Sequence, residues 1–340
     1  MKAAGWGRLL RLSLAPSAAA DSVAGICLGA WGTLPERRES LLLPLGALCV
    51  YHGGMALNDW ADRARDAQSR PERPIPSGQV PAGGALALAV LLLVAGPGLA
   101  AAASPAVGLL MAAVAACAAL YDLAGRGPWR GPLLLALCRG GNLGCGVLLG
   151  ATIAREHGFA GPPAPAWAAC ALYAGYVLSV SRMARLEDAE DERPLERRPS
   201  RALLSAAACW MILPAIAVIP WSAASRATSA SGTSTPTVAT FAAVLPLCLA
   251  FALAVRALLV ESSRPSWSRA LVGRATGMAL RRLLVFTSTC ALISFLATLR
   301  LRGGGAESAA IAGWSGLVVA YAILLGYPLS FALRRAFPPT

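Results

Sequence analysis

The sequence predicts an all-α membrane protein, a bundle of about nine to ten transmembrane helices in one domain covering residues 1–340. Only 14% of the residues are charged and the mean hydropathy is +0.59, whereas soluble domains carry about 25% charged residues. Apolar stretches long enough to cross the hydrocarbon core, roughly 20 residues each, recur along the whole chain. We therefore expect a multi-pass integral membrane protein.

Ten apolar stretches are candidate spans, with Ser104-Pro105 as the one break within the 81–121 block. They cover residues 14–34, 41–57, 81–103, 105–121, 132–152, 166–183, 202–221, 238–259, 283–300 and 309–331.

The basic residues predict the orientation. If the N-terminus is cytoplasmic, 23 of the 30 basic residues fall in cytoplasmic segments, as the positive-inside rule requires. Arg334 and Arg335 then favour an even number of spans. We expect a plasma membrane of the bacterial, inner-membrane type with a cytoplasmic N-terminus.

The net charge of +13 is explained by this asymmetry, and part of it can attract anionic lipid headgroups or phosphorylated substrates. No soluble basic domain is present, so we expect no nucleic-acid partner. All nine cysteines lie in apolar segments without a CxxC pair, which is typical of packing residues.

The acidic residues are concentrated in two places. Ten of the 17 lie within 59–72 and 187–196. Each cluster follows an even-numbered span, so both are expected on the cytoplasmic face.

The first cluster places Asp59, Asp62 and Asp66 at i, i+3 and i+7. A helix continuing from the second span would align them on one face, where their repulsion calls for a cation. Mg²⁺ typically takes one or two carboxylates and substrate phosphate oxygens, and Asn58 offers a further oxygen ligand or an orienting donor. The alternative is a solvated extension whose acids balance nearby arginines. The Pro-rich turn that follows, residues 70–78, is at least a rigid connector, and Arg73 in it is placed to contact a phosphate.

The second cluster spaces Asp188 and Asp191 at i, i+3, and Glu187 and Asp191 at i, i+4. Alone, such a run is typical of a solvated patch. Facing the first cluster, it suits a second ion on a diphosphate.

Three motifs resemble the UbiA family of intramembrane aromatic prenyltransferases. Residues 58–66 match its NDxxDxxxD motif, residues 73–78 are similar to its RPxPSG stretch, and residues 138–144 are similar to its R-x-x-N-x-x-x-G pattern. The region around Arg274–Leu284 resembles the EboC-like branch.

The resemblance implies a central cavity open to the membrane, in which Mg²⁺ and cations draw diphosphate from an allylic substrate. An electron-rich, lipid-soluble, aromatic acceptor then attacks the allylic cation. It implies metal ligation by Asn58, Asp59, Asp62, Asp66, Asp188, Asp191 and Glu192. Asp62, Asp66, Asp188 and Asp191 would be catalytic, and Asn58, Arg73, Arg126, Arg139, Asn142 and Arg193 would bind substrate. Arg11 is a further candidate for the acceptor. For Arg139, an intramembrane charge and hence a functional candidate, the alternative is snorkelling to the cytoplasmic surface.

Two features depart from the family pattern. Arg185 stands where a carboxylate is expected before the second motif, and Tyr121 is followed by Arg126 one position late for Tyr-x-x-x-Lys. These changes fit either a different substrate or lost catalysis.

The leading hypothesis is therefore a Mg²⁺-dependent prenyltransferase that uses a prenyl diphosphate and a hydrophobic acceptor. The alternatives are a non-catalytic carrier of a prenylated or aromatic metabolite and a structural membrane partner. A carrier would often show inverted repeats, and the chain has none. His52 is either an acid–base group facing the cavity or a packing residue.

Overall fold

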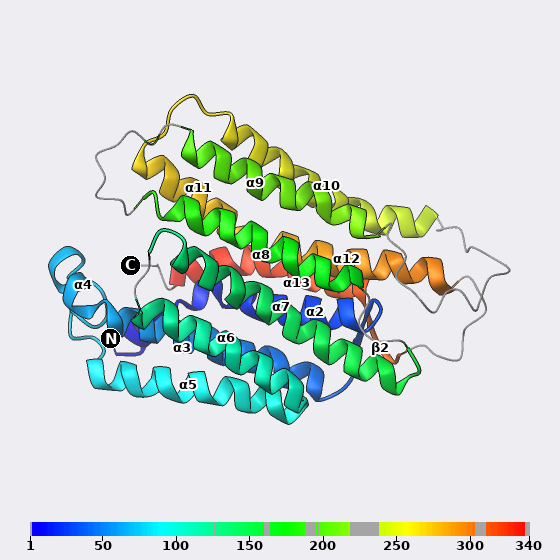
Figure 1. Cartoon of the computed structure of the whole chain (residues 1–340), viewed down its shortest axis with the longest axis horizontal. Coiled ribbons are helices and arrows are strands. Elements are labelled where there is room, and N and C mark those ends of the chain that lie inside the picture. The colour runs from blue at the N-terminus through cyan, green and yellow to red at the C-terminus, as the bar shows by residue number, and fades with distance from the viewer. Residues whose placement is uncertain are drawn as a thin grey trace.

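The computed structural model describes residues 2–124, 127–159, 164–187, 195, 197–217, 238–302 and 311–336. Its long helices run side by side along the longest dimension of the molecule (Figure 1). Ten of the described segments are long and apolar enough to cross a membrane, which confirms the predicted all-helical, multi-pass architecture.

The first half of the bundle begins with α1 (Lys2–Leu9), a short 3₁₀ turn (Leu12–Leu14) and α2 (Ala15–Gly29). There follow α3 (Glu39–Ala61), the short α4 (Arg63–Ser69), α5 (Ala82–Ala103), α6 (Pro105–Leu123) and α7 (Arg130–Glu156). The predicted break between the third and fourth spans is present: Ser104 is extended, with φ −165° and ψ 131°, as a residue before proline prefers.

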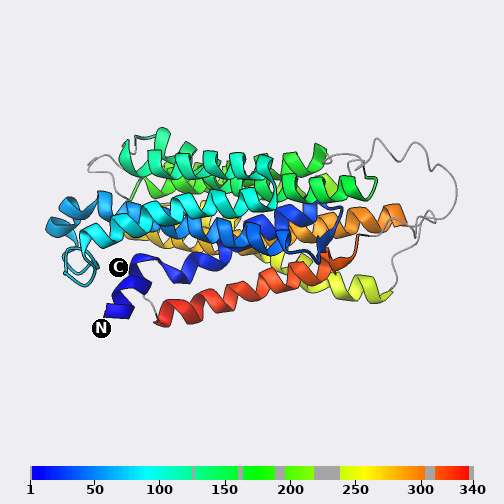
Figure 2. The ribbon, with the colours of Figure 1, turned by 90° about the horizontal axis from the view of Figure 1, so that it is seen from below.

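The second half contains α8 (Ala164–Ala184), α9 (Arg198–Ile212) with a 3₁₀ turn (Leu213–Ala217), α10 (Val238–Ser262), α11 (Arg269–Arg281), α12 (Leu283–Arg302) and α13 (Gly316–Ala336). The ends of α13 and α1 lie at the same end of the molecule (Figure 2), as an even number of spans requires. Because α4 also lies there, we call it the α4 end.

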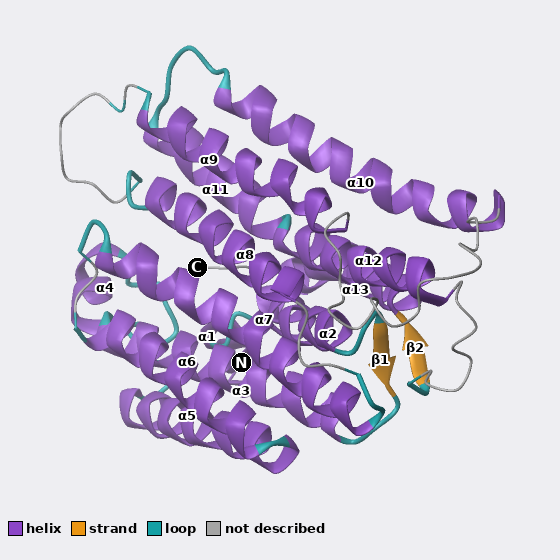
Figure 3. Ribbon diagram, turned by 45° about the vertical axis from the view of Figure 1, so that its right-hand side comes forward, coloured by secondary structure: helices purple, strands orange, loops and turns teal. Residues whose placement is uncertain are grey.

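Two elements differ from the predicted spans. The stretch 260–282, which lies between two predicted spans, contains α11, whose first turn is capped by the Ser268 hydroxyl accepting from the Leu271 N–H at 3.3 Å. The second is a two-stranded ladder at the end opposite α4 (Figure 3). There β1 (Thr33–Pro35) pairs antiparallel with β2 (Gly313–Ser315), so residues predicted within the first and tenth spans form strands instead.

A close helix contact joins α2 to α7. A Cβ added at Gly25 would lie 2.1 Å from the Leu143 carbonyl oxygen, and one at Gly146 would lie 2.2 Å from the Ser22 carbonyl oxygen. Small residues let helix backbones approach in this way in membranes. The same contact brings polar side chains of α2 and α7 together. All nine cysteines of the chain are free thiols.

Candidate active site

The row of aspartates sits where α3 gives way to α4. Asp62 is the residue between the two helices, with φ −83° and ψ −3°, so the single continuous helix expected from the sequence is interrupted there. The Asp62 N–H still donates to the Asn58 carbonyl and the Asp66 N–H to the Asp62 carbonyl. The three carboxylates therefore remain close to the predicted spacing.

Arg73 supplies positive charge to the two buried members of this row. Its Nη1 lies 2.7 Å from an Asp66 oxygen and 3.6 Å from an Asp59 oxygen, and Arg11 lies 3.3 Å from the same Asp59 oxygen. Asp62 pairs instead with Arg65 at 3.3 Å. The mutual repulsion of the three aspartates, which the sequence predicted, is thus offset in the structure by these three arginines.

Local backbone geometry places both arginines. The Arg73 carbonyl accepts from the Ser77 hydroxyl at 2.7 Å, and Gly78 adopts a φ of +72° that closes the Pro-rich turn. Arg11 also has a left-handed backbone, with φ +48°, and its carbonyl accepts from the Tyr51 hydroxyl at 3.3 Å. A non-glycine residue held at positive φ is uncommon, so the segment between α1 and α2 is constrained by its surroundings.

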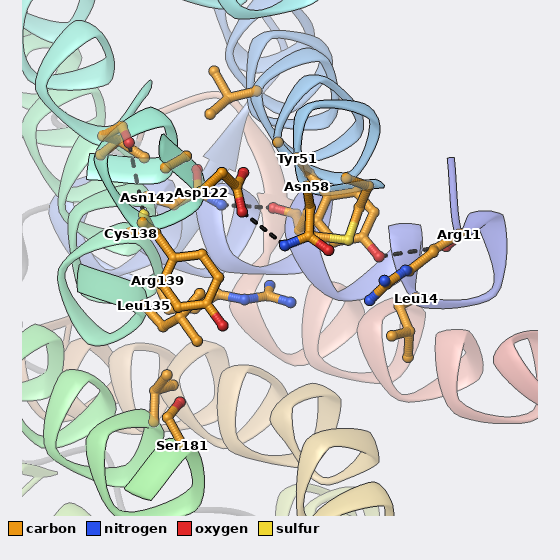
Figure 4. A pocket seen from close by; sticks show the side chains of 18 of the residues that line it. Arg11, Leu14, Tyr51, Asn58, Asp122, Leu135, Cys138, Arg139, Asn142 and Ser181 are labelled. Carbon is orange, nitrogen blue, oxygen red and sulfur yellow. Dashed lines mark hydrogen bonds between the residues drawn. The ribbon is translucent and has the colours of Figure 1, made fainter. Parts of the chain in front are cut away.

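A cavity of about 390 Å³ opens beside these groups (Figure 4), within the size range of small-molecule sites. At the α4 end it is lined by the polar residues Arg11, Asn58, Asp62, Arg65, Arg70, Arg73, Tyr121 and Asp122. Farther along, its walls are largely apolar, with Leu14, Ala18, Ala47, Val50, Met55, Met111, Val114, Ala118, Leu135 and Val177. A charged headgroup and an apolar chain therefore have separate places in one cavity.

Asp122, at the end of α6, is a cavity residue that the sequence analysis missed. Its Oδ1 accepts from the Asn58 side-chain amide at 2.7 Å. Because that bond uses the amide nitrogen, the Asn58 side-chain oxygen points elsewhere. The sequence signal that could have identified Asp122 is its position directly after Tyr121, which the family pattern had marked.

The inner part of the cavity contains Arg139 and Asn142 of α7. Arg139 follows the start of α7 by nine residues, which places it about 14 Å along that helix at 1.5 Å per residue. It does not snorkel: its Nη1 donates to Asp21 at 2.8 Å and its Nη2 to the Ser17 hydroxyl at 2.9 Å. Asp21, on α2, was also missed. An acidic residue within the first span was the signal that could have found it.

Other predicted residues are placed differently. Asp59 and Asp66 are buried beside the cavity and do not line it. His52 lies with its Nδ1 2.8 Å from the Leu10 carbonyl oxygen and is not a lining residue, as the packing alternative expected. Arg185, in place of the expected carboxylate, lines a smaller cavity of about 140 Å³ that shares Tyr121 and Ser181 with the main one.

Three predicted metal ligands of the second acidic cluster lie outside the described residues: Asp188, Asp191 and Glu192. The predicted substrate-binding residues Arg126 and Arg193 also lie outside them. Glu187 is described and is exposed; a Cβ added at Gly273 of α11 would meet its Oε1 at 2.5 Å. Within the described ranges, no three His, Cys, Asp or Glu side chains converge as a metal site. The carboxylates of Asp62 and Asp122 with the amide of Asn58 are nevertheless the donor types that suit Mg²⁺ when substrate oxygens complete its shell.

Comparison with known proteins identifies the class. Residues 21–272 match the model of the UbiA prenyltransferase family. The chain belongs to that family, as its motifs had predicted.

Among named relatives, the digeranylgeranylglyceryl phosphate synthase of Methanothrix thermoacetophila is 40% identical over 80 residues, 23% of this chain and 29% of that protein. The chain thus matches less than a third of that relative's length.

Solved structures share the fold over most of the chain. A digeranylgeranylglyceryl phosphate synthase structure superposes with a TM-score of 0.55 at 15% identity, covering 88% of this chain and 99% of that one. A UbiA homologue from Archaeoglobus fulgidus bound to GPP and Mg²⁺ superposes with a TM-score of 0.53 at 15% identity, covering 86% and 99%.

Proposed function

We propose that this protein is a Mg²⁺-dependent prenyltransferase that moves a prenyl group from an allylic diphosphate to a lipid-soluble acceptor inside the membrane. The observation that carries the proposal is a single cavity with acids, an amide and arginines at its α4 end and apolar walls beyond. Family membership supports the same activity, and the Archaeoglobus relative bound GPP and Mg²⁺.

Each part of the cavity has a role in this proposal. Arg65, Arg70 and Arg73 bind the diphosphate, since guanidinium groups match phosphate oxygens in charge and geometry. Asn58, Asp62 and Asp122 would hold Mg²⁺, which supplies neutralisation of the charge that develops on departing diphosphate. The apolar walls hold the prenyl chain and exclude water from the allylic cation.

The orientation proposed for the chain puts the α4 end in the cytoplasm of a bacterial-type cell, where a soluble or membrane-bound diphosphate reaches the polar residues. The predicted second set of ligands, Asp188, Asp191 and Glu192, belongs to the same proposal, as do Arg126 and Arg193. Assignment to the EboC-like branch and an aromatic acceptor are also part of it.

The test measures diphosphate release by the purified protein in nanodiscs, with a panel of allylic diphosphates, Mg²⁺ and candidate acceptors. We expect release that EDTA abolishes and that falls at least about 100-fold in Asp62→Ala, a loss typical of removing a group that stabilises transition-state charge. The matched control is Glu72→Ala, because Glu72 is exposed and lies outside the cavity lining.

Equal release by Asp62→Ala and wild type would contradict the proposal. Binding of the prenyl diphosphates without release across the panel would instead favour the carrier, with Arg185 as the first residue to examine.

A further inference from the structure

A buried ion pair lies at the inner part of the cavity. The Asp21 side chain is fully buried. Its Oδ2 accepts from Arg139 at 2.8 Å and from the Asn142 amide at 3.4 Å, while its Oδ1 accepts from the Tyr173 hydroxyl at 2.6 Å. None of the diphosphate-binding roles assigned above uses this group.

The contacts of Asp21 fit an ionised carboxylate. Both of its oxygens accept from donors, and one donor is a guanidinium that stays charged in proteins. Arg139 and the Asn142 amide nitrogen can only donate, and the charge of Arg139 beside the carboxyl group favours its ionised form. The positive charge of Arg139 is therefore balanced by the negative charge of Asp21.

Arg139 still faces the cavity. Its side chain is 19% exposed and belongs to the cavity lining. A guanidinium carries five N–H donors, more than the bonds to Asp21 and Ser17 use. The residue can therefore donate a hydrogen bond to a ligand while its charge is compensated from the other side.

Asn142, one turn farther along α7, lines the same cavity. Its amide nitrogen donates to the Ala18 carbonyl at 2.8 Å and faces Asp21. Since both neighbours only accept, they fix which end of the amide is nitrogen. The Asn142 Oδ1 is left buried without a hydrogen-bond partner, a costly state for a polar atom.

We propose that this inner part of the cavity selects an uncharged acceptor that presents a hydroxyl group, and disfavours acceptors that carry a carboxylate there. A hydroxyl both accepts, from Arg139, and donates, to the Asn142 Oδ1. A carboxylate cannot donate, and it would lie near the Asp21 carboxylate in surroundings of low dielectric, where like charges repel strongly. This inference rests on the proposed function, because it names the acceptor class of that cavity.

The experiment measures equilibrium binding and needs no turnover. Two probes of similar size, benzyl alcohol and benzoate, are titrated into the full-length protein in nanodiscs. We expect wild type to bind the alcohol at least about tenfold more tightly. In Asp21→Asn, the uncompensated Arg139 should reverse the preference toward the carboxylate by at least about tenfold, which is about 1.4 kcal/mol.

Two further variants separate charge from folding. The double variant Asp21→Asn/Arg139→Gln removes both charges and should show no preference for the carboxylate, so a switch confined to the single variant reports the unpaired cation. Asp62→Ala should lose diphosphate release and keep the wild-type probe preference. Failure of the proposed function is thereby distinguished from failure of this inference.

Tighter binding of the carboxylate by wild type would overturn the proposal, and so would an unchanged probe ratio in a folded Asp21→Asn variant. The proposal is also overturned if the alcohol probe fails to bind wild type. If Asp21→Asn does not fold, the wild-type ratio and the double variant still decide the question.

Discussion

Arg73 occupies a position between two buried carboxylates, and this single residue links the Pro-rich turn to the aspartate row. Its side chain is 7% exposed, that of Asp59 is 5% and that of Asp66 is 2%. The Asp66 Oδ1 and the Arg73 Nε are buried without partners. The site thus carries a charge balance that a bound diphosphate would change, because Arg73 is one of the residues proposed to bind it.

Replacing Arg73 should therefore destabilise the protein when Mg²⁺ is absent. Arg73→Gln leaves the Asp59 and Asp66 carboxylates buried with less compensation, and removing one partner from a buried ion pair costs about 3–5 kcal/mol. The free energy of unfolding, measured in detergent with EDTA, should fall by that amount.

The control for this variant is Arg63→Gln. Arg63 is exposed and stacks on Trp60, with its guanidinium carbon 4.3 Å from the ring centroid, so its loss should change stability by no more than about 0.5–1 kcal/mol. Equal unfolding free energies for Arg73→Gln and wild type would show that the Arg73 ion pairs contribute nothing to the fold.

Packing of α2 on α7 is the element-scale feature on which the inner polar group depends. Asp21 and Ser17 come from α2, whereas Arg139 and Asn142 come from α7, and the two backbones meet at Gly25 and Gly146. Any residue larger than glycine at this contact pushes the helices apart. The hydrogen bonds between Asp21 and Arg139 would lengthen as a consequence.

We expect Gly25→Ala to lower both stability and function. Its Cβ would lie 2.1 Å from the Leu143 carbonyl oxygen, a backbone atom that moves only with its helix, and forcing extra volume into a packed core costs about 1–3 kcal/mol. Thermal unfolding in detergent provides the measurement.

Gly98→Ala on α5 is the matched control for this substitution. A Cβ there meets nothing within 4 Å, so the change should be neutral or stabilising by up to about 1 kcal/mol, the difference in helix propensity between alanine and glycine. If both variants unfold alike, the close contact between α2 and α7 does not limit stability.

Elements that depend on local composition were predictable from the sequence. Apolar length identified the spans, and Ser104-Pro105 identified the break between α5 and α6. The pairing of Thr33 with Ser315 was not predictable, because it joins three-residue strands far apart in the chain. α11 was hidden because its arginines lower the hydropathy of a segment that is nonetheless helical.

The residues of the candidate site fall into the same two groups, those that local sequence predicts and those that depend on contacts between distant segments. Asn58 and Asp62 were found because one contiguous motif carries them, and Arg73 because a second short motif follows it. Asp122 and Asp21 were missed because their roles arise from contacts with Asn58 and Arg139, which are 64 and 118 residues away. Such pairings depend on how helices pack, and hydropathy contains no information on which helix faces which.

At the scale of the whole molecule, charge asymmetry and cavity position support the same orientation. The cavity's polar part lies at the α4 end, where the chain also begins, and most arginines are assigned to that side. A cell that supplies diphosphates from its cytoplasm would then deliver them directly to Arg65, Arg70 and Arg73. Both ends of the chain and α4 should therefore face the cytoplasm.

Labelling of single introduced cysteines in intact bacterial cells tests this orientation. Ser69→Cys, at the end of α4, and Glu36→Cys, near β1 at the opposite end, are both exposed positions. A membrane-impermeant maleimide should label Glu36→Cys in intact cells and Ser69→Cys only after permeabilisation, with the unaltered chain measuring the background from its nine cysteines. The reverse pattern would place the aspartate row outside the cytoplasm, and a cytoplasmic diphosphate could then reach it only by first crossing the membrane, because the cavity's polar groups lie at the α4 end.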